Sequence, residues 1–404
     1  MSYNTVNTMV AERVLAVNKD NWNYRIERIL TPQLLQLIDL LHELFFDSRN
    51  QNLIKRHSEF KIALKNSSEI FSTSDSSQSN GAFSVEVQSA LKQVRSVVSV
   101  SPDSTHQLIK HFTNTDPGNA VDALIFDFED GFKSSLSNLV TSYNNLTEIV
   151  SGNARYIPRK NQFQFSAAET CIKPPHIIMR VRGLHQNECS LMFGNEFACA
   201  SIVDLVYGIY NQVKFLNPLQ KQITILIPKC YDAAEATWWQ NLLLEIEEIF
   251  GLKQGSIRVI IEAGSTRNCV QLEMMIHELQ NRITGIYANM RTKFFDDLRH
   301  QIKRTGEILP ARIDAETDSA AMLNFLNYVC RVASKFNLHS IAGLTLNAAG
   351  NLYDASEDEQ VAVYEQQIDA LCKIRFDAMQ VTHASFAQRI NFSKSSINAS
   401  AALT

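Results

Sequence analysis

The stretch "LIFDFEDGF", Leu124–Phe132, decides how the rest of the sequence is interpreted. Its apolar start is typical of a strand buried on both faces, as the strands of parallel sheets are. Three carboxylates follow at once: Asp127, Glu129 and Asp130. A carboxylate that leaves water needs a cation, a hydrogen-bond donor or a bound water. Two interpretations are therefore open: the strand ends in a solvated polar turn, or its acids line one side of an active site.

The stretch belongs to a series of similar runs. From about residue 95 onward, short apolar runs alternate with longer amphipathic stretches, of which residues 232–251 are the clearest helix. Such alternation predicts a parallel sheet, and eight strands are the number that closes a (β/α)8 TIM barrel. A doubly wound open sheet is the alternative, weakened because no glycine-rich nucleotide-binding motif follows any run. The predicted strands are 96–100, 123–128, 177–181, 223–227, 257–262, 283–288, 340–346 and 378–383.

The sequence outside the predicted barrel has a different character. Residues 29–46 carry an apolar stripe at helical spacing and predict a packing helix. A serine-rich stretch then predicts a flexible loop or linker. We therefore expect four parts: an N-terminal helical region, residues 1–64; a linker, 65–90; the barrel, 91–390; and a tail, 391–404.

Composition excludes several classes of protein. The net charge of −4 leaves no electrostatic footprint for nucleic acid. No apolar stretch has the length of a membrane span and no signal core opens the sequence, so we expect a soluble, cytoplasmic protein. The 7 cysteines are irregularly spaced without a C-x-x-C pair, which argues against a disulfide framework and a zinc ribbon.

Charged residues gather where the predicted strands end. Arg180 and Arg182 close the third run, Lys229 follows the fourth, and Glu262 ends the fifth. In a TIM barrel the chemistry lies at the C-terminal ends of the strands. Carboxylates there suit a divalent metal, and an arginine neutralises an oxyanion. The pattern favours a pocket for a small anionic substrate.

Six motifs in the same order resemble malate synthase of the A type, within the citrate lyase β superfamily. The resemblance covers nearly the whole chain after residue 25. It implies a TIM barrel, Mg2+, and condensation of acetyl-CoA with glyoxylate to malate. The motifs are "ILTPQLLQLIDLLHELFF", "ALIFDFEDGF", "IIMRVRGLH", the segment from "ILIPK" to "IIEA", "SIAGL" and "FDAMQVTHASF".

The resemblance also implies roles for residues. Arg180 matches the arginine that stabilises the enolate of acetyl-CoA, and Glu262 matches a carboxylate ligand of Mg2+. The acids after the second strand match the group that braces the metal and the arginine. We assign Arg180, Glu129 and Asp127 to catalysis, Arg182, Lys229 and Thr292 to substrate binding, and Glu262 and Asp130 to the metal.

Two departures from the family pattern limit this expectation. Thr292 stands where the family has its second metal carboxylate, and threonine is a poor Mg2+ ligand; Asp296 or Asp297 replaces it only if the loop shifts by about one helical turn. The family also has a C-terminal helical domain that supplies the catalytic base, whereas the last carboxylate here is Asp377. A Claisen condensation needs a base, so we expect another residue, a neighbouring subunit or a different reaction.

Three functions remain open at this stage. The first is a divergent enzyme that forms or cleaves a C–C bond of a small 2-oxo or 2-hydroxy acid, with or without acyl-CoA. The second is malate synthase activity itself. The third is a catalytically inactive barrel that binds a metabolite or a protein. We expect no nucleotide cofactor, no nucleic acid and no membrane partner, and a homo-oligomer would cover the open end of the barrel.

Overall fold

The computed structural model describes most of the chain. The described residues are 14–16, 29–65, 83–85, 87, 89–112, 120–153, 155–156, 165–166, 174–215, 223–289, 297, 320–343, 357–381, 386–387 and 389–390. The serine-rich stretch lies largely outside them.

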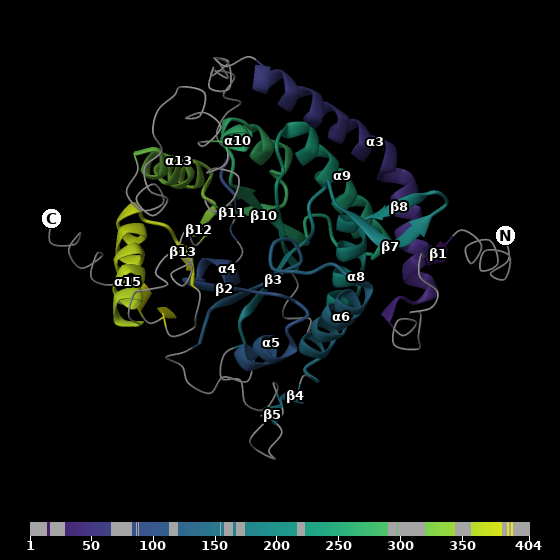
Figure 1. Ribbon diagram of the computed structural model, residues 1–404, viewed down its shortest axis with the longest axis horizontal. Coiled ribbons are helices and arrows are strands. Elements are labelled where there is room, and N and C mark those ends of the chain that lie inside the picture. Colours follow the sequence, from purple (N-terminus) through teal and green to yellow (C-terminus); the bar gives the residue numbers. More distant parts are fainter. Residues whose placement is uncertain are drawn as a thin grey trace.

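Eight parallel strands close a barrel, so the TIM barrel prediction is confirmed and the open sheet is wrong (Figure 1). All eight predicted runs become strands, with bounds that differ by a few residues at most among those described. Around the barrel the order is β10 (Ile257–Ala263), β11 (Ile283–Ala288), β12 (His339–Ala342), β13 (Ala378–Gln380), β2 (Ser96–Val100), β3 (Ala123–Asp127), β6 (His176–Arg180) and β9 (Ile223–Ile227).

Helices surround the barrel and bury the outer faces of its strands (Figure 1). Two of them begin at side-chain caps: Asp232 accepts a hydrogen bond from the Glu235 amide, and Ser265 forms a capping box with Asn268. The helices after the strands are α5 (Thr105–Phe112), α6 (Leu136–Val150), α8 (Ala200–Phe215), α9 (Ala233–Ile249), α10 (Thr266–Glu278), α13 (Ala320–Phe336) and α15 (Glu357–Ile374); the short α4 (Ser89–Lys92) precedes β2.

Helix α3 (Pro32–Lys65) continues beyond the apolar stripe that predicts a packing helix over residues 29–46. Its first half carries the predicted apolar stripe, with Leu34, Ile38 and Leu41 buried. The polar second half also stays helical, and α3 as a whole contacts α8 and α9 (Figure 1). Helix propensity alone does not fix so polar a segment against the protein surface. Contacts with distant parts of the chain fix it there.

A small antiparallel sheet beside the barrel was not predicted. The strand β1 (Val14–Ala16) pairs with β7 (Asn187–Phe193), which pairs with β8 (Glu196–Cys199). Gly194, with a φ of 61°, supports the turn between β7 and β8. The pairing of β1 with β7 joins segments far apart and leaves little local pattern to detect, whereas β7 and β8 form a local hairpin. A second hairpin joins β4 (Arg155–Tyr156) to β5 (Phe165–Ser166).

Every second side chain of a barrel strand points into the barrel interior, where these side chains form a core of their own. Ile125, Ile178 and Ile260 point inward, whereas the residues between them pack against the helices. Because side chains alternate along a strand, the residues two positions further on also point inward. These are Asp127, Arg180 and Glu262, so the acids and the arginine enter the barrel from three strands.

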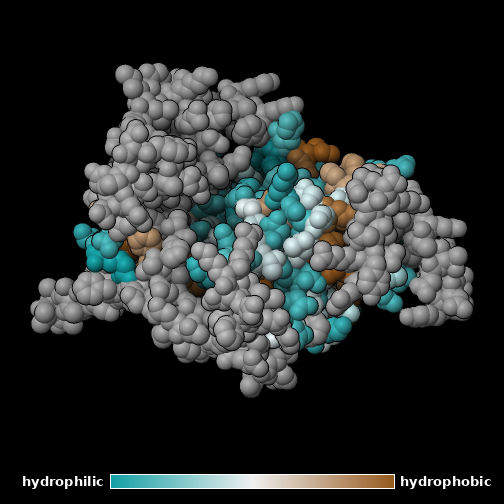
Figure 2. Space-filling model, turned by 60° about the horizontal axis from the view of Figure 1, so that its bottom comes forward, coloured by the Kyte–Doolittle hydropathy of each residue, from teal (hydrophilic) through white to brown (hydrophobic). Residues whose placement is uncertain are grey.

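The surface of the described part is mixed, as the face in Figure 2 shows, with hydrophilic and hydrophobic residues side by side. Some large apolar side chains are exposed, among them Leu40, Leu44 and Ile54 on α3. Among the described helices, none is both long and apolar enough to cross a membrane.

Candidate active site

A polar layer closes the C-terminal end of the barrel. It combines inward-facing residues from several strands, and three of them were not singled out in the sequence. Ser99 and Gln380 join the layer because each lies two residues after an inward apolar residue, Val97 and Ala378, and Tyr287 itself belongs to the inward core. The Ser99 hydroxyl donates to Asp127 at 3.0 Å, and the Tyr287 hydroxyl donates to Gln380. The two-residue period of each strand was the signal that could have found them.

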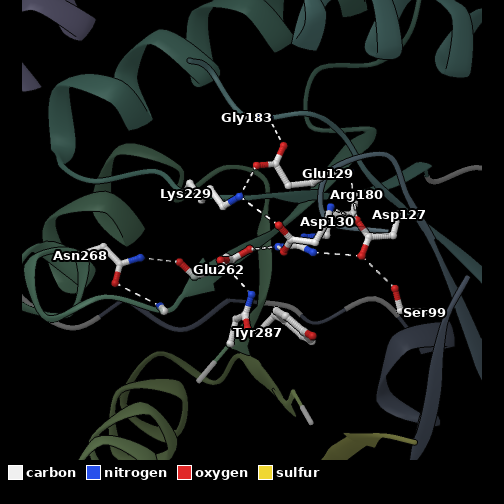
Figure 3. A network of polar contacts seen from close by, with 12 residues as sticks. Ser99, Asp127, Glu129, Asp130, Arg180, Gly183, Lys229, Glu262, Asn268 and Tyr287 are labelled. Carbon is white, nitrogen blue, oxygen red and sulfur yellow. Dashed lines mark hydrogen bonds and ion pairs between the residues drawn. The ribbon is translucent and has the colours of Figure 1, made fainter. Parts of the chain in front are cut away.

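Arg180 lies at the centre of this layer (Figure 3). Its Nη1 contacts Asp127 Oδ2 at 3.0 Å, and its Nη2 contacts Asp130 Oδ2 and Glu262 Oε2 at 2.6 Å each. The side chain is only 4% exposed. Its Nε has no hydrogen-bond partner within the described residues. The sequence predicted these groups at one end of the barrel, and the structure brings them into direct contact.

Asp127 explains why the acidic turn after β3 has its shape. Its Oδ1 accepts hydrogen bonds from the amides of Glu129 and Asp130, both at 3.0 Å. This side-chain-to-backbone turn is typical of aspartate. It directs the Asp127 Oδ2 to Arg180 and turns the two following carboxylates over the barrel end. The strand does end in a turn, but Asp127 and Glu129 are buried against cations, so the interpretation as a solvated turn is wrong for these two acids.

Lys229 is the second cation of the site (Figure 3). Its Nζ lies 2.6 Å from Glu129 Oε1 and 3.0 Å from Asp130 Oδ1. The other oxygen of Glu129 accepts bonds from the Gly183 amide at 2.6 Å and from Gln186 Nε2 at 2.7 Å. Lys229 also has a φ of 49°, a left-handed conformation that is unfavourable for any residue with a Cβ.

Burial and charge act together on the pKa values. Burial alone would raise the pKa of Asp130, but the positive charges of Arg180 and Lys229 outweigh it and lower that pKa. Burial raises the pKa of Glu262, although Arg180 opposes the change. Burial disfavours the charged forms of Arg180 and Lys229, yet their carboxylate neighbours raise both pKa values. Both basic groups are therefore cations at neutral pH.

The residues fit a divalent cation in charge and in donor type. Four carboxylates face two cations, so two negative charges are left without a partner charge. Carboxylate oxygens are the donors that Mg2+ prefers. The expected ligands, Glu262 and Asp130, both contact Nη2 of Arg180, and Glu262 Oε1 accepts from Asn289 at 3.2 Å. No ready-made group of three metal-binding side chains occurs among the residues that the structure covers.

The predicted substitute ligands have different positions. Asp297 accepts bonds from the Thr266 amide at 2.9 Å and from its hydroxyl at 2.7 Å, so it caps α10. Thr292 and Asp296 lie outside the described residues. The role of Thr292 in substrate binding stays a prediction.

Arg182 lies outside the polar layer. Its guanidinium binds Asp204 at 2.8 Å and Glu188 at 2.6 Å, and the side chain is 1% exposed. The Tyr143 hydroxyl donates to the same Asp204. These partners join β6 to α6, α8 and β7. We therefore assign Arg182 to the support of the fold and leave it out of the proposed binding site.

Comparison with known proteins identifies the family. The sequence-family model of the malate synthase TIM barrel domain matches residues 176–379, half of the 404-residue chain. The chain belongs to the malate synthase family. Malate synthase of Arabidopsis thaliana is 22% identical over 221 residues, which cover 54% of this chain and 39% of that protein. Malate synthase A of Escherichia coli (strain K12) is 21% identical over 225 residues, 55% of this chain and 41% of that protein.

Structural comparison agrees on the fold. Malate synthase of Haloferax volcanii, solved at 3 mM glyoxylate, has a TM-score of 0.51 and 13% identity, with 76% of each chain covered. Similarity at this identity concerns the barrel and not the reaction. The sequence matches span about two fifths of the curated malate synthases, so the activity of those proteins does not pass directly to this chain.

Proposed function

We propose that this protein is a divergent, Mg2+-dependent member of the malate synthase family. It forms or cleaves a C–C bond next to the carboxylate of a small 2-oxo or 2-hydroxy acid. The observation that carries the proposal is the buried guanidinium of Arg180, held by three carboxylates at the C-terminal end of the barrel. Burying a charge and its partners is expensive. Such an arrangement is expected where a developing oxyanion must be met by a charge already in place.

Each residue has a separate role in this proposal. Arg180 stabilises the oxyanion of an enolate or a 2-oxo acid, and its free Nε leaves one donor for it. Asp127 orients the guanidinium through Nη1. Lys229 presents an ammonium at the barrel end, where it attracts the substrate carboxylate. Glu129 holds that ammonium in place from a side chain with no exposed surface.

The metal would be held by Glu262 and Asp130. When bound, Mg2+ supplies a Lewis acid that polarises a carbonyl oxygen. Its two positive charges would match the two carboxylate charges left without a partner. The relatives in solved structures include a malate synthase complex with magnesium and glyoxylate, which supports the choice of ion. We extend the proposal to acyl-CoA as a second substrate because another solved complex of that family contains acetyl-CoA.

A second function is favoured by one specific observation. Both Nη atoms of Arg180 already bind carboxylates, and Glu262 has a protein donor at each oxygen. A site closed on itself in this way suits a catalytically inactive barrel that binds a metabolite or a protein. The two functions differ in whether metal and oxoacid bind together.

A thermal-shift series separates the two functions. The full chain is melted with glyoxylate, pyruvate, oxaloacetate, malate or an acyl-CoA, each with Mg2+, Mn2+ or a chelator. We expect one oxoacid to raise the melting temperature only when metal is present; a ligand at ~100 times its Kd adds about 2.7 kcal/mol to the free energy of unfolding. Turnover is then assayed with that oxoacid. No response to any metal and oxoacid pair would contradict the enzyme proposal.

A matched variant controls for nonspecific effects. Arg282 is a second buried arginine, bound to Glu247 at 3.0 Å, and it precedes β11 at the opposite end of the barrel. Arg282→Lys changes the same chemistry far from the site, so it should keep the metal-dependent response. Arg180→Lys should lose it, because lysine cannot reach three carboxylates with a planar fork of donors.

A further inference from the structure

Two arginines of α3 reach loops that follow strands of the barrel. Arg49 donates from Nε to the Leu184 carbonyl at 2.7 Å and from Nη2 to the Gln186 carbonyl at 3.1 Å. Arg56 donates from Nη2 to the Lys229 carbonyl at 3.2 Å. The two arginines are seven residues apart, which places them on one side of the helix. One helix thus contacts the loops after both β6 and β9.

Arg56 makes several contacts with the loop after β9 and with the start of α9. Its Nε and Nη2 bind the two oxygens of Glu235 at 2.7 and 2.6 Å, and its guanidinium lies 4.4 Å from the ring centre of Tyr231. Glu235 also accepts from the Tyr231 amide at 2.9 Å. The Glu235 side chain is 1% exposed, so its charge depends on this arginine. A bidentate pair fixes orientation as well as distance.

The loops after β6 and β9 both bind the carboxylate of Glu129. The loop after β6 binds Glu129 Oε2 through the Gly183 amide and the Gln186 side chain. The loop after β9 binds Glu129 Oε1 through the Lys229 ammonium. Every hydrogen bond that the structure records for the Glu129 carboxylate therefore comes from a loop that α3 contacts.

The backbone of Lys229 needs this support. A left-handed conformation at a residue with a Cβ persists only where the surroundings fix it. Here the carbonyl is held by Arg56 on one side, and the ammonium is held by Glu129 and Asp130 on the other. If the carbonyl is released, the residue is free to return to an ordinary conformation. Its side chain would then leave the two carboxylates.

We propose that α3 is a positioning element of the barrel end, and that Arg49 and Arg56 fix the loops that hold Glu129 and Lys229. Neither arginine contacts Arg180 or Glu262 in the structure, so they act through the residues that they hold. The effect of this positioning on substrate binding rests on the proposed function. The effect of Arg56 on Lys229 is independent of that function, and it can be tested without any ligand.

The test measures the accessibility of Lys229 in the full chain. Acetic anhydride reacts with unprotonated amines, so an ammonium held between two carboxylates is labelled slowly. Labelling of Lys229 is compared by mass spectrometry with that of Lys335, which pairs with Glu273 on the outside of the barrel. In Arg56→Lys we expect the ratio to rise roughly 2- to 10-fold, the shift that corresponds to one lost hydrogen bond. Arg282→Lys, which alters an equivalent arginine–glutamate pair, should leave the ratio unchanged.

The outcomes separate this inference from the proposed function. An unchanged ratio in folded Arg56→Lys overturns the inference. A raised ratio with a weaker response to oxoacid and Mg2+ supports both. A raised ratio in a protein whose wild-type form binds no oxoacid supports the positioning role and overturns the proposed function. If Arg56→Lys does not fold, Glu235→Gln serves in its place, because it keeps the shape of the partner and removes its charge.

Discussion

Arg180 and Glu262 meet across the interior of the barrel, with Nη2 of the arginine 2.6 Å from Oε2 of the glutamate. Their strands, β6 and β10, are not neighbours, because β9 lies between them. The two side chains therefore meet across the interior at the C-terminal end of the barrel, and they are not neighbours on adjacent strands. It exists because both residues occupy the inward position two residues after a buried isoleucine.

Replacing Arg180 should remove function before it removes the fold. We expect Arg180→Lys to lower turnover of the responsive oxoacid by ~100-fold or more, the typical loss of one oxyanion donor. Steady-state kinetics on the folded variant measures this. Arg282→Lys is the control and should keep wild-type kinetics. Unchanged turnover in Arg180→Lys would remove Arg180 from the site.

Removing the carboxylate of Glu262 should separate metal binding from oxoacid binding. In Glu262→Gln we expect the heat of Mg2+ binding in calorimetry to fall below detection, because a neutral amide is a poor ligand for a hard cation. Glu247→Gln makes the same change at the opposite end of the barrel and should leave Mg2+ binding intact. Equal Mg2+ affinity in both variants would place the metal elsewhere.

Arg182 should matter for stability alone. Arg182→Met leaves the buried Asp204 and Glu188 without their cation, and we expect a loss of about 3–5 kcal/mol in the free energy of unfolding. Urea unfolding measures the loss, and ligand response is read below the melting transition. A variant of wild-type stability that no longer binds oxoacid would return Arg182 to the substrate site.

The stability of the fold should depend on pH through His176. This residue begins β6, shares a hydrogen bond with Thr224 at 2.9 Å, and burial lowers its pKa from 6.5 to about 4. Because the folded pKa lies below the unfolded one, the neutral ring stabilises the fold fully above pH 6.5, and this contribution is lost as the pH falls toward 4.

The size of that effect is at most roughly 3 kcal/mol. Urea unfolding at pH 7, 5.5 and 4 measures it, and the dependence should be shallower in His176→Asn. Part of the slope should remain, because burial also lowers the pKa of His42 to about 4. An equal slope in wild type and His176→Asn would show that folding does not shift the pKa of His176.

The sequence predicted much of the fold because its signal was local. Each barrel strand is a short apolar run bounded by turn residues, and each predicted strand formed. The antiparallel strands β7 and β8 were not predicted: β7 pairs with β1, which lies far away in the chain, whereas β7 and β8 form a local hairpin. The second half of α3 falls within the expected N-terminal helical region, residues 1–64, but the sequence did not predict that loops beyond β6 and β9 contact its arginines.

The sequence alone determined which residues stand at the strand ends, since strand period and chain order place Asp127, Arg180 and Glu262 on the inside at one end. Tertiary structure decided what those residues contact. It gave Arg180 three carboxylates, turned Arg182 into a buried support, and brought Lys229 onto Glu129 through a left-handed backbone. The physical reason is range: periodicity acts over a few residues, whereas these contacts join positions 22 to 100 residues apart, which only the closed barrel brings together.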